Sequence, residues 1–230
     1  MGTCSTAPTP LTEGAESTLD YQSSEQKQDS QPFPYRELIG SLMYLVVATR
    51  PDIAYAVAYL SQFLNNPQGK HWTYAKRVLR YLKGTKSYSI FYKRLTCRPQ
   101  IIVFSDASHG LSSWPGYCFS IGSGPISWKS KKLRCSTTST TETKFYALSL
   151  ATQQCLFIQN LLIEMDFTKD ALKEPIIHVD NQGTINYVET EASLGKLKHI
   201  NLKFKFVKEK VQLKVVTLQY IETKKNIDDI

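Results

Sequence analysis

The sequence predicts an α/β domain with a mixed sheet, preceded by a small unit of three helices. Apolar residues recur every three to four positions between residues 35 and 85, which is typical of helices. After residue 85 they alternate over short runs, which is typical of strands. One long helical run interrupts these strands, and further strands and helices follow it. Such a succession favours an α/β domain over an all-β one.

Length, composition and charge exclude several classes of protein. The chain has 230 residues, 42% hydrophobic and 11% aromatic, so it can bury a core and is too apolar to be wholly disordered. Its apolar runs are much shorter than a membrane span. No secretory signal is visible, and five cysteines without a Cys-x-x-Cys pair indicate a reducing compartment. We therefore expect an intracellular protein, cytoplasmic or nuclear, that is not secreted and has no membrane partner.

Residues 1–34 differ in composition from the rest of the chain. They are rich in Ser, Thr, Gln, Pro and Glu and have almost no large aliphatic side chains. Such a stretch cannot offset the entropy lost on ordering. We expect a disordered tail or linker here.

Three helices are expected over residues 35–87. Thr49-Arg50-Pro51 separates the first helix from the second, and Asn65-Asn66-Pro67 ends the second. The third helix ends at Gly84. Its outer face carries four basic residues, namely Lys76, Arg77, Arg80 and Lys83.

The α/β domain is expected over residues 88–230. The predicted strands are 89–92, 101–104, 117–121, 126–129, 176–179 and 213–221. The predicted helices are 140–165, 181–188 and 202–211. Cys118 and Cys155 lie among apolar residues, so we expect them to be small core residues rather than metal ligands.

Two aspartates follow predicted strands, and a third acidic site closes the chain. Asp106 follows the predicted strand that ends at Phe104-Ser105, and Asp180 follows the one that ends at Val179. Asp228-Asp229 lies beyond the last predicted strand. Any one Asp after a strand is ordinary turn chemistry. Because active sites of α/β sheets collect at the carboxyl ends of strands, the set together predicts a divalent-metal site.

The long helix places a lysine on its buried face. Its inward stripe runs Leu148, Ala151, Cys155, Ile158, Leu162 and Met165, and one turn before Leu148 the same stripe reaches Lys144. Two interpretations are open: a lysine that extends to solvent at the helix end, or an ammonium directed at Asp106 and Asp180. Glu142 is rotated by about 200° from Lys144, which predicts that it faces away. Ser139-Thr140-Thr141-Glu142 also fits a capping box.

Several motifs together resemble the C-terminal end of a copia-type retrotransposon Pol polyprotein. They are YRELIGSLMYL (35–45), TRPDIAYAV (49–57), AKRVLRYLKGT (75–85), SDA (105–107), ISWKSKK (126–132), STTETKFYAL (139–148), HVDNQGTI (178–185) and KHINLKFKFV (198–207). The resemblance implies a helical connection segment after a reverse transcriptase, over residues 35–87, and a ribonuclease H-like domain over 88–230 with a mixed sheet and flanking helices. The polymerase motif YVDD is absent from the sequence, so polymerase activity is not expected.

The resemblance also implies a chemistry. In that family four carboxylates hold two Mg²⁺ ions, with Mn²⁺ as an alternative, and cut the RNA strand of an RNA·DNA hybrid. Asp106, Asp180 and Asp229 match three of these catalytic, metal-binding carboxylates, whereas Lys144 stands where the family has its catalytic Glu. The set then carries a net charge of −2 instead of −4. We therefore expect metal binding and cleavage to be impaired, with Lys144 paired to Asp106 and Asp180.

Two clusters of basic residues are candidates for nucleic-acid binding. Their members are Lys129, Lys131, Lys132, Arg134, Lys198 and His199. Phosphate contacts supply most non-specific affinity, and the net charge of +8 is compatible with them. A solvated, lysine-rich helix face accounts equally well for the second cluster.

Three functions remain open from the sequence. The first is a working ribonuclease that acts on RNA·DNA hybrids. The second is an impaired ribonuclease H-like domain that still binds nucleic acid, with the rest of a Pol polyprotein as a further partner. The third is a protein-interaction module whose helical unit forms the contact surface.

Overall fold

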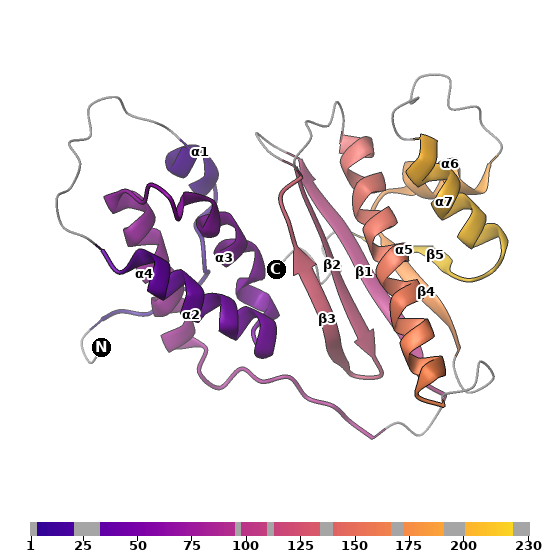
Figure 1. Cartoon of the computed structure of the whole chain (residues 1–230), viewed down its shortest axis with the longest axis horizontal. Coiled ribbons are helices and arrows are strands. Elements are labelled where there is room, and N and C mark those ends of the chain that lie inside the picture. The colour runs from indigo at the N-terminus through magenta and orange to yellow at the C-terminus, as the bar shows by residue number, and fades with distance from the viewer. Residues whose placement is uncertain are drawn as a thin grey trace. The chain divides into compact units, whose positions relative to one another are not determined.

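The computed structural model describes residues 4–20, 33–94, 98–109, 113–133, 140–166, 173–190 and 201–222. The chain forms two compact units, Met1–Ser89 and Ile90–Ile230 (Figure 1).

The first unit contains the three predicted helices, which are α2 (Tyr35–Ala48), α3 (Ala54–Leu60) and α4 (Gly69–Gly84). Short 3₁₀ turns at Pro51–Ile53 and Ser61–Phe63 flank α3, where Pro51 begins a turn as its fixed φ favours. The apolar stripes of the helices meet in a core. Its fully buried members include Tyr35, Ile39, Leu42, Ile53, Val57, Leu60, Ala75 and Val78.

Arg50 joins the start of α3 to the end of α4. Its guanidinium donates to both carboxylate oxygens of Asp52, at 2.9 and 2.7 Å, and to Thr85 Oγ1 at 2.6 Å. The Arg50 residue is only 8% exposed. A charge buried to this degree needs such partners, because an unpaired buried ion is costly.

The structure differs from the expected disordered tail over part of residues 1–34. Residues 4–20 lie along α4 and include a short helix, α1 (Ala15–Asp20). Ala15 and Leu19 are buried, and His71 contacts the Leu19 carbonyl oxygen at 3.3 Å. Composition failed here because three buried apolar residues, Ala7, Ala15 and Leu19, and the polar donors of α4 suffice to hold a short segment.

The second unit is built on a mixed sheet of five strands. The strands are β1 (Gln100–His109), β2 (Ser113–Ile121), β3 (Gly124–Ser130), β4 (Lys173–Val179) and β5 (Thr217–Tyr220). Their order is β3-β2-β1-β4-β5, with β1–β2 and β2–β3 antiparallel and β1–β4 and β4–β5 parallel. The mixed sheet that the ribonuclease H resemblance implies is therefore confirmed.

Residues 89–92 do not form the predicted strand. They run beside the β2–β3 turn, where Tyr92 Oη donates to the Pro125 carbonyl oxygen at 2.6 Å and Lys93 N donates to Ser123 Oγ at 2.8 Å. These are contacts through side chains rather than a backbone ladder. The approach is so close that a Cβ at Gly124 would lie 2.7 Å from the Tyr92 ring.

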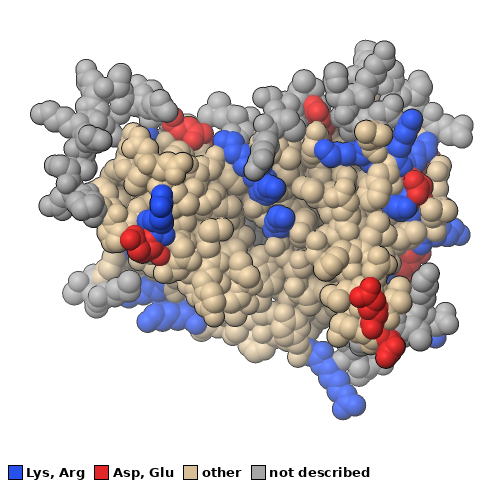
Figure 2. Space-filling view, viewed as in Figure 1, with Lys and Arg blue, Asp and Glu red and all other residues tan. Residues whose placement is uncertain are grey.

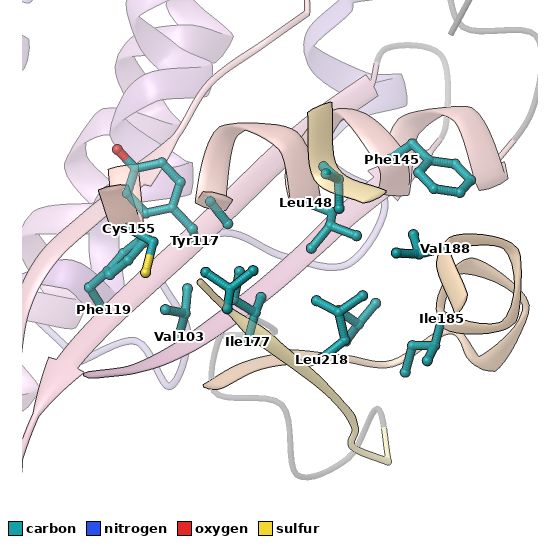
Figure 3. Close-up of a cluster of buried hydrophobic side chains, with 14 of the residues drawn as sticks. Val103, Tyr117, Phe119, Phe145, Leu148, Cys155, Ile177, Ile185, Val188 and Leu218 are labelled. Carbon is teal, nitrogen blue, oxygen red and sulfur yellow. The ribbon is translucent and has the colours of Figure 1, made fainter. Parts of the chain in front are cut away.

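Three helices flank the sheet, as predicted: α5 (Thr140–Glu164), α6 (Gln182–Glu189) and α7 (Asn201–Gln212). The long helix α5 runs along the sheet in Figure 1. Figure 3 shows the core between them, where Leu148 and Cys155 from α5 meet Val103, Ile177 and Leu218 from the strands.

Most of the predicted α5 stripe is confirmed. Leu148, Ala151, Cys155 and Ile158 are buried, and Cys118 is buried in β2. The stripe was wrong at its end, because Met165 lies beyond the helix and is 60% exposed. Within the described residues, no helix combines the length and apolar character needed to cross a bilayer.

Candidate functional site

Asp106 and Asp180 lie at the same edge of the sheet because β1 and β4 are parallel and in register. Ser105 pairs with Val179 in this register, so each of these residues is followed directly by an aspartate. The expected convergence of the two aspartates is therefore present. Asp106 does not follow its strand as predicted, however, because β1 continues to His109 and its last residues pair with β2.

Lys144 completes the cluster from the start of α5. Its ammonium nitrogen Nζ donates to both carboxylate oxygens of Asp180, each at 2.6 Å. The same nitrogen lies 3.7 Å from Asp106 Oδ1. The predicted pairing of Lys144 with the two aspartates is confirmed.

The cluster is largely withdrawn from water. The side chain of Asp180 is 5% exposed, that of Asp106 15% and that of Lys144 18%. At such burial an ion pair is screened much less than at the surface. Asp180 therefore depends on Lys144 for charge balance, and the described members carry two negative charges against one positive charge.

Glu142 was predicted to face away, and this prediction was wrong. Glu142 is 8% exposed and the next residue, Thr143, is fully buried. Thr143 Oγ1 contacts Ser113 Oγ of β2 at 3.2 Å. The first turn of α5 is thus enclosed on more than one side, which the helical period alone does not reveal. Ser139, the predicted cap residue, lies outside the described residues.

The described residues do not fit a pair of divalent cations. A hard cation such as Mg²⁺ needs several free oxygen ligands. Here both carboxylate oxygens of Asp180 accept hydrogen bonds from Lys144. Among the described residues no group of three His, Cys, Asp or Glu side chains could hold a metal ion. Asp229, the third predicted ligand, lies outside the described residues.

The basic residues predicted to contact nucleic acid are described only in part. Lys129 and Lys131 are exposed and Lys132 is half-buried, all at the end of the edge strand β3. Arg134, Lys198 and His199 lie outside the described residues. Figure 2 shows basic side chains spread over the visible faces of both units.

The sheet register places Lys129 and Lys131 two strands away from Asp106. Asp106 pairs with Gly116 in β2, and Gly116 pairs with Ser130 in β3. Lys129 and Lys131 therefore flank the position that lies two strands from Asp106, a span of about 10 Å at ~4.8 Å per strand.

Sequence reasoning missed an aromatic partner for α7. Lys203 Nζ lies 3.4 Å from the centroid of the Tyr146 ring in α5. Tyr146 is two residues from Lys144 along the chain. The sequence shows that α7 is rich in lysine, but no motif in the sequence indicates that Lys203 lies over the ring of Tyr146.

Solved structures that align with this chain have low sequence identity. LC11-RNase H1 in complex with an RNA/DNA hybrid aligns over 55% of this chain and 88% of its own, with 15% identity and a TM-score of 0.41. A foamy viral protease-reverse transcriptase in complex with an RNA/DNA hybrid aligns over 96% of this chain and 28% of its own, with 12% identity and a TM-score of 0.49.

No family model matches the sequence, but curated relatives do. The retrovirus-related Pol polyprotein from transposon TNT 1-94 of Nicotiana tabacum is 32% identical over 211 residues, 90% of this chain and 16% of that protein. The Pol polyprotein from transposon RE2 of Arabidopsis thaliana is 34% identical over 203 residues, 86% of this chain and 14% of that protein.

A shorter relative aligns with this chain over almost the whole of the relative's own length. The secreted RxLR effector protein 161 of Plasmopara viticola is 42% identical over 130 residues, 54% of this chain and 91% of that protein. The two transposon proteins are far longer than the chain, which spans 16% and 14% of their lengths. On these similarities the chain belongs to the family of copia-type retrotransposon Pol polyproteins.

Proposed function

We propose that this chain is the ribonuclease H-like portion of a retrotransposon Pol polyprotein that binds RNA·DNA hybrids, with cleavage of the RNA strand impaired. One observation carries the proposal: Lys144 Nζ lies 2.6 Å from both carboxylate oxygens of Asp180 and 3.7 Å from Asp106 Oδ1. A cation of the protein itself thus stands among carboxylates that the family uses for metal ions.

The electrostatics of the cluster support the impairment. A unit charge about 4 Å from another is worth about 4 kcal/mol at an effective dielectric constant of 20. An ammonium at 2.6 and 3.7 Å from the two carboxylates therefore opposes any added divalent cation strongly. It also removes the carboxylate that Glu would supply at residue 144.

The basic edge of the sheet supports the binding of a hybrid. Lys129 and Lys131 are exposed and flank the register position of Asp106 on β3. A duplex bound along this edge strand would bring its phosphates to these exposed lysines. Duplexes of A-like form are bound mainly through backbone and 2′-hydroxyl contacts, so binding does not require catalysis.

Cleavage of a labelled RNA·DNA hybrid in Mg²⁺ or Mn²⁺ tests the impairment. The full chain, Lys144→Glu and the neutral control Lys144→Gln are compared. We expect no turnover from the full chain or from Lys144→Gln, and measurable turnover from Lys144→Glu. Robust cleavage by the full chain that Lys144→Glu does not improve would contradict the proposal.

Thermal unfolding gives a second readout that does not depend on activity. A ligand that binds only the folded state raises Tm. We expect Mg²⁺ to raise the Tm of Lys144→Glu and to leave that of the full chain unchanged. An equal rise for both proteins would show that Lys144 does not exclude the ion.

A protein-interaction module remains the second candidate function because α2 exposes apolar side chains. Met43 is 45% exposed, Tyr44 74% and Val47 76%. Apolar surface of this kind marks contact sites when it is contiguous. A hybrid that shows no salt-sensitive electrophoretic shift with the full chain would favour this candidate over the first.

A further inference from the structure

The basic face of α4 is covered by the beginning of the chain. We call residues 4–12 the N-terminal strap. Its backbone runs beside α4, with the Ala7 amide nitrogen 3.4 Å from the Arg80 carbonyl oxygen. At Gly84 the approach is so close that a Cβ would lie 3.2 Å from Thr6 Cβ.

Three cations of α4 donate hydrogen bonds to the strap. Arg77 Nη2 donates to Thr9 Oγ1 at 3.0 Å, and Lys83 Nζ donates to the Cys4 carbonyl oxygen at 2.7 Å. Arg80 donates from Nε to the carbonyl oxygen of Ser5 and from Nη2 to its hydroxyl oxygen, both at 2.8 Å. These residues recur at every third position, so their cations form a slanted row along the helix, spaced about 4.5 Å apart in rise.

The strap offers these cations only uncharged acceptors. Every acceptor named above is an uncharged oxygen. The described part of the chain gives Arg77 and Arg80 no carboxylate partner, and it leaves the buried Arg77 Nε without a hydrogen-bond acceptor. A phosphate oxygen is a better acceptor for these cations than a carbonyl or hydroxyl oxygen, because its negative charge adds a Coulombic attraction to the hydrogen bond.

The strap is held more weakly than the helix that follows it. Ala7 is the one buried residue of the strap, and its side chain is only a methyl group, so little apolar surface holds the strap in place. In contrast, α1 buries Leu19 to 1% exposure and contacts α4 through His71. The strap can therefore leave α4 while α1 stays in place.

We propose that Arg77, Arg80 and Lys83 form a binding surface for a nucleic-acid phosphodiester backbone, and that the N-terminal strap covers this surface as a displaceable internal competitor. The surface belongs to the helical unit and is separate from the Lys129–Lys131 edge of the α/β unit. Its three contacts would release counterions on binding, and they carry no sequence information.

A reversible crosslink between strap and helix tests the proposal. The variant Thr6→Cys/Gly84→Cys is made with Cys4→Ser to avoid a competing thiol. The 3.2 Å between the two Cβ positions is slightly shorter than the usual disulfide range, so a small shift allows the bond. The same protein, oxidised and then reduced, is its own control.

Binding of a twenty-base-pair DNA duplex is measured against salt concentration. With three phosphate contacts, the slope of log K against log salt should be steeper by about 2.7 in the reduced protein than in the oxidised one. The duplex should also bind more tightly to the reduced protein at low salt. Equal slopes and affinities in both states would overturn the proposal.

Two further variants separate this surface from the rest of the chain. Deletion of residues 1–12 removes the competitor, so this variant should bind the duplex at least as tightly as the reduced protein. Adding Arg77→Gln, Arg80→Gln and Lys83→Gln to it should remove the gain. Lys129→Gln/Lys131→Gln should leave the gain intact, because those residues belong to the other unit. A gain that survives the α4 substitutions would assign it elsewhere and reject the surface.

Discussion

At the scale of single residues, Lys144 and Asp180 depend on each other. Asp180 has a side chain only 5% exposed, and Lys144 donates to both of its oxygens at 2.6 Å. A buried ion pair adds little to stability compared with an apolar pair, but removing one partner strands the other charge. Replacing one partner alone should therefore lower the stability of the second unit, and replacing both with apolar residues should restore much of it.

We expect Lys144→Met to lower the free energy of unfolding by about 2–4 kcal/mol, because it leaves Asp180 buried without its cation. The double variant Lys144→Met/Asp180→Leu should recover much of this loss. Lys131→Met, which alters an exposed lysine, is the matched control and should have little effect. Urea unfolding of these proteins together with the single variant Asp180→Leu completes a double-mutant cycle that measures the coupling, and additive effects would contradict it.

The members of this cluster could be predicted from two sequence patterns, one typical of strands and one typical of helices. Predicted strand ends pointed to Asp106 and Asp180, although Asp106 lies within β1 rather than after it. The 3.6-residue period placed Lys144 on the buried face of α5. The same period misplaced Glu142, because it gives an angle around the helix and not what lies at that angle. Glu142 is 8% exposed because neighbouring structure encloses the first turn, and that enclosure arises only in the folded chain.

At the scale of elements, α5 presents one apolar side chain to the core and another of the same type to solvent. Leu148 is fully buried, whereas Leu161 is 43% exposed. We expect Leu148→Ala to lower the free energy of unfolding by about 2–5 kcal/mol, through lost burial and a cavity. Leu161→Ala should cost much less. Similar losses at both positions, measured by denaturant unfolding, would mean that α5 does not bury the face described here.

The first turn of α4 introduces a dependence on pH. His71 Nδ1 accepts a hydrogen bond from the Gln68 backbone nitrogen at 2.9 Å, and burial lowers the pKa of His71 below its ordinary value of 6.5. On acidification the unfolded chain therefore binds a proton at residue 71 before the folded chain does. The stability contributed by neutral His71 is present above pH 6.5 and is lost as the pH falls from 6.5 toward the lowered pKa.

We expect thermal unfolding of the full chain to shift to lower temperature between pH 7 and pH 5, and His71→Gln to weaken this pH dependence. His178, whose pKa burial also lowers, is unchanged in both proteins and supplies a common background. Tm values that fall in parallel for the two proteins across this range would exclude His71 as a source of the effect.

Elements with strong periodicity were predicted best, and segments that depend on distant partners were not. The predicted helices of both units are present. The sheet differs from prediction at its first expected strand and at its last, where 213–216 form a turn and only Thr217–Tyr220 pair as β5. Residues 89–92 have alternating apolar residues, but their contacts run through Tyr92 and Ser123 instead of a backbone ladder. Residues 4–20 are polar in composition, and their order depends on donors that α4 supplies from more than fifty residues away.

At the scale of the whole molecule, the effect of the net charge of +8 on nucleic-acid binding depends on which cations are exposed. Lys129 and Lys131 are exposed at the sheet edge, whereas Arg50 is buried against Asp52 and Lys144 against Asp180. Only cations free to approach a polyanion contribute to counterion release. The electrostatic footprint on a nucleic acid should therefore be much smaller than the formal charge.

We expect Lys129→Gln/Lys131→Gln to reduce the slope of log K against log salt for a hybrid by about 1.4–1.8, because two phosphate contacts are lost. Lys144→Gln should leave this slope unchanged, since its nitrogen is engaged by Asp180. Fluorescence anisotropy at several salt concentrations gives both numbers. A slope that stays the same in the double variant would remove these lysines from the interface.

The close packing at Gly124 limits which substitutions the protein tolerates at this position. A methyl group there would lie 2.7 Å from the Tyr92 ring and 2.8 Å from the Phe91 carbonyl oxygen. The carbonyl belongs to the backbone, so it can give way only if the chain at Phe91 moves. Even Gly124→Ala would therefore push the segment after Ser89 off the hairpin. The β2–β3 turn therefore has no space for any side chain at residue 124. A single nucleotide change at that codon would displace residues 91–92 from the turn.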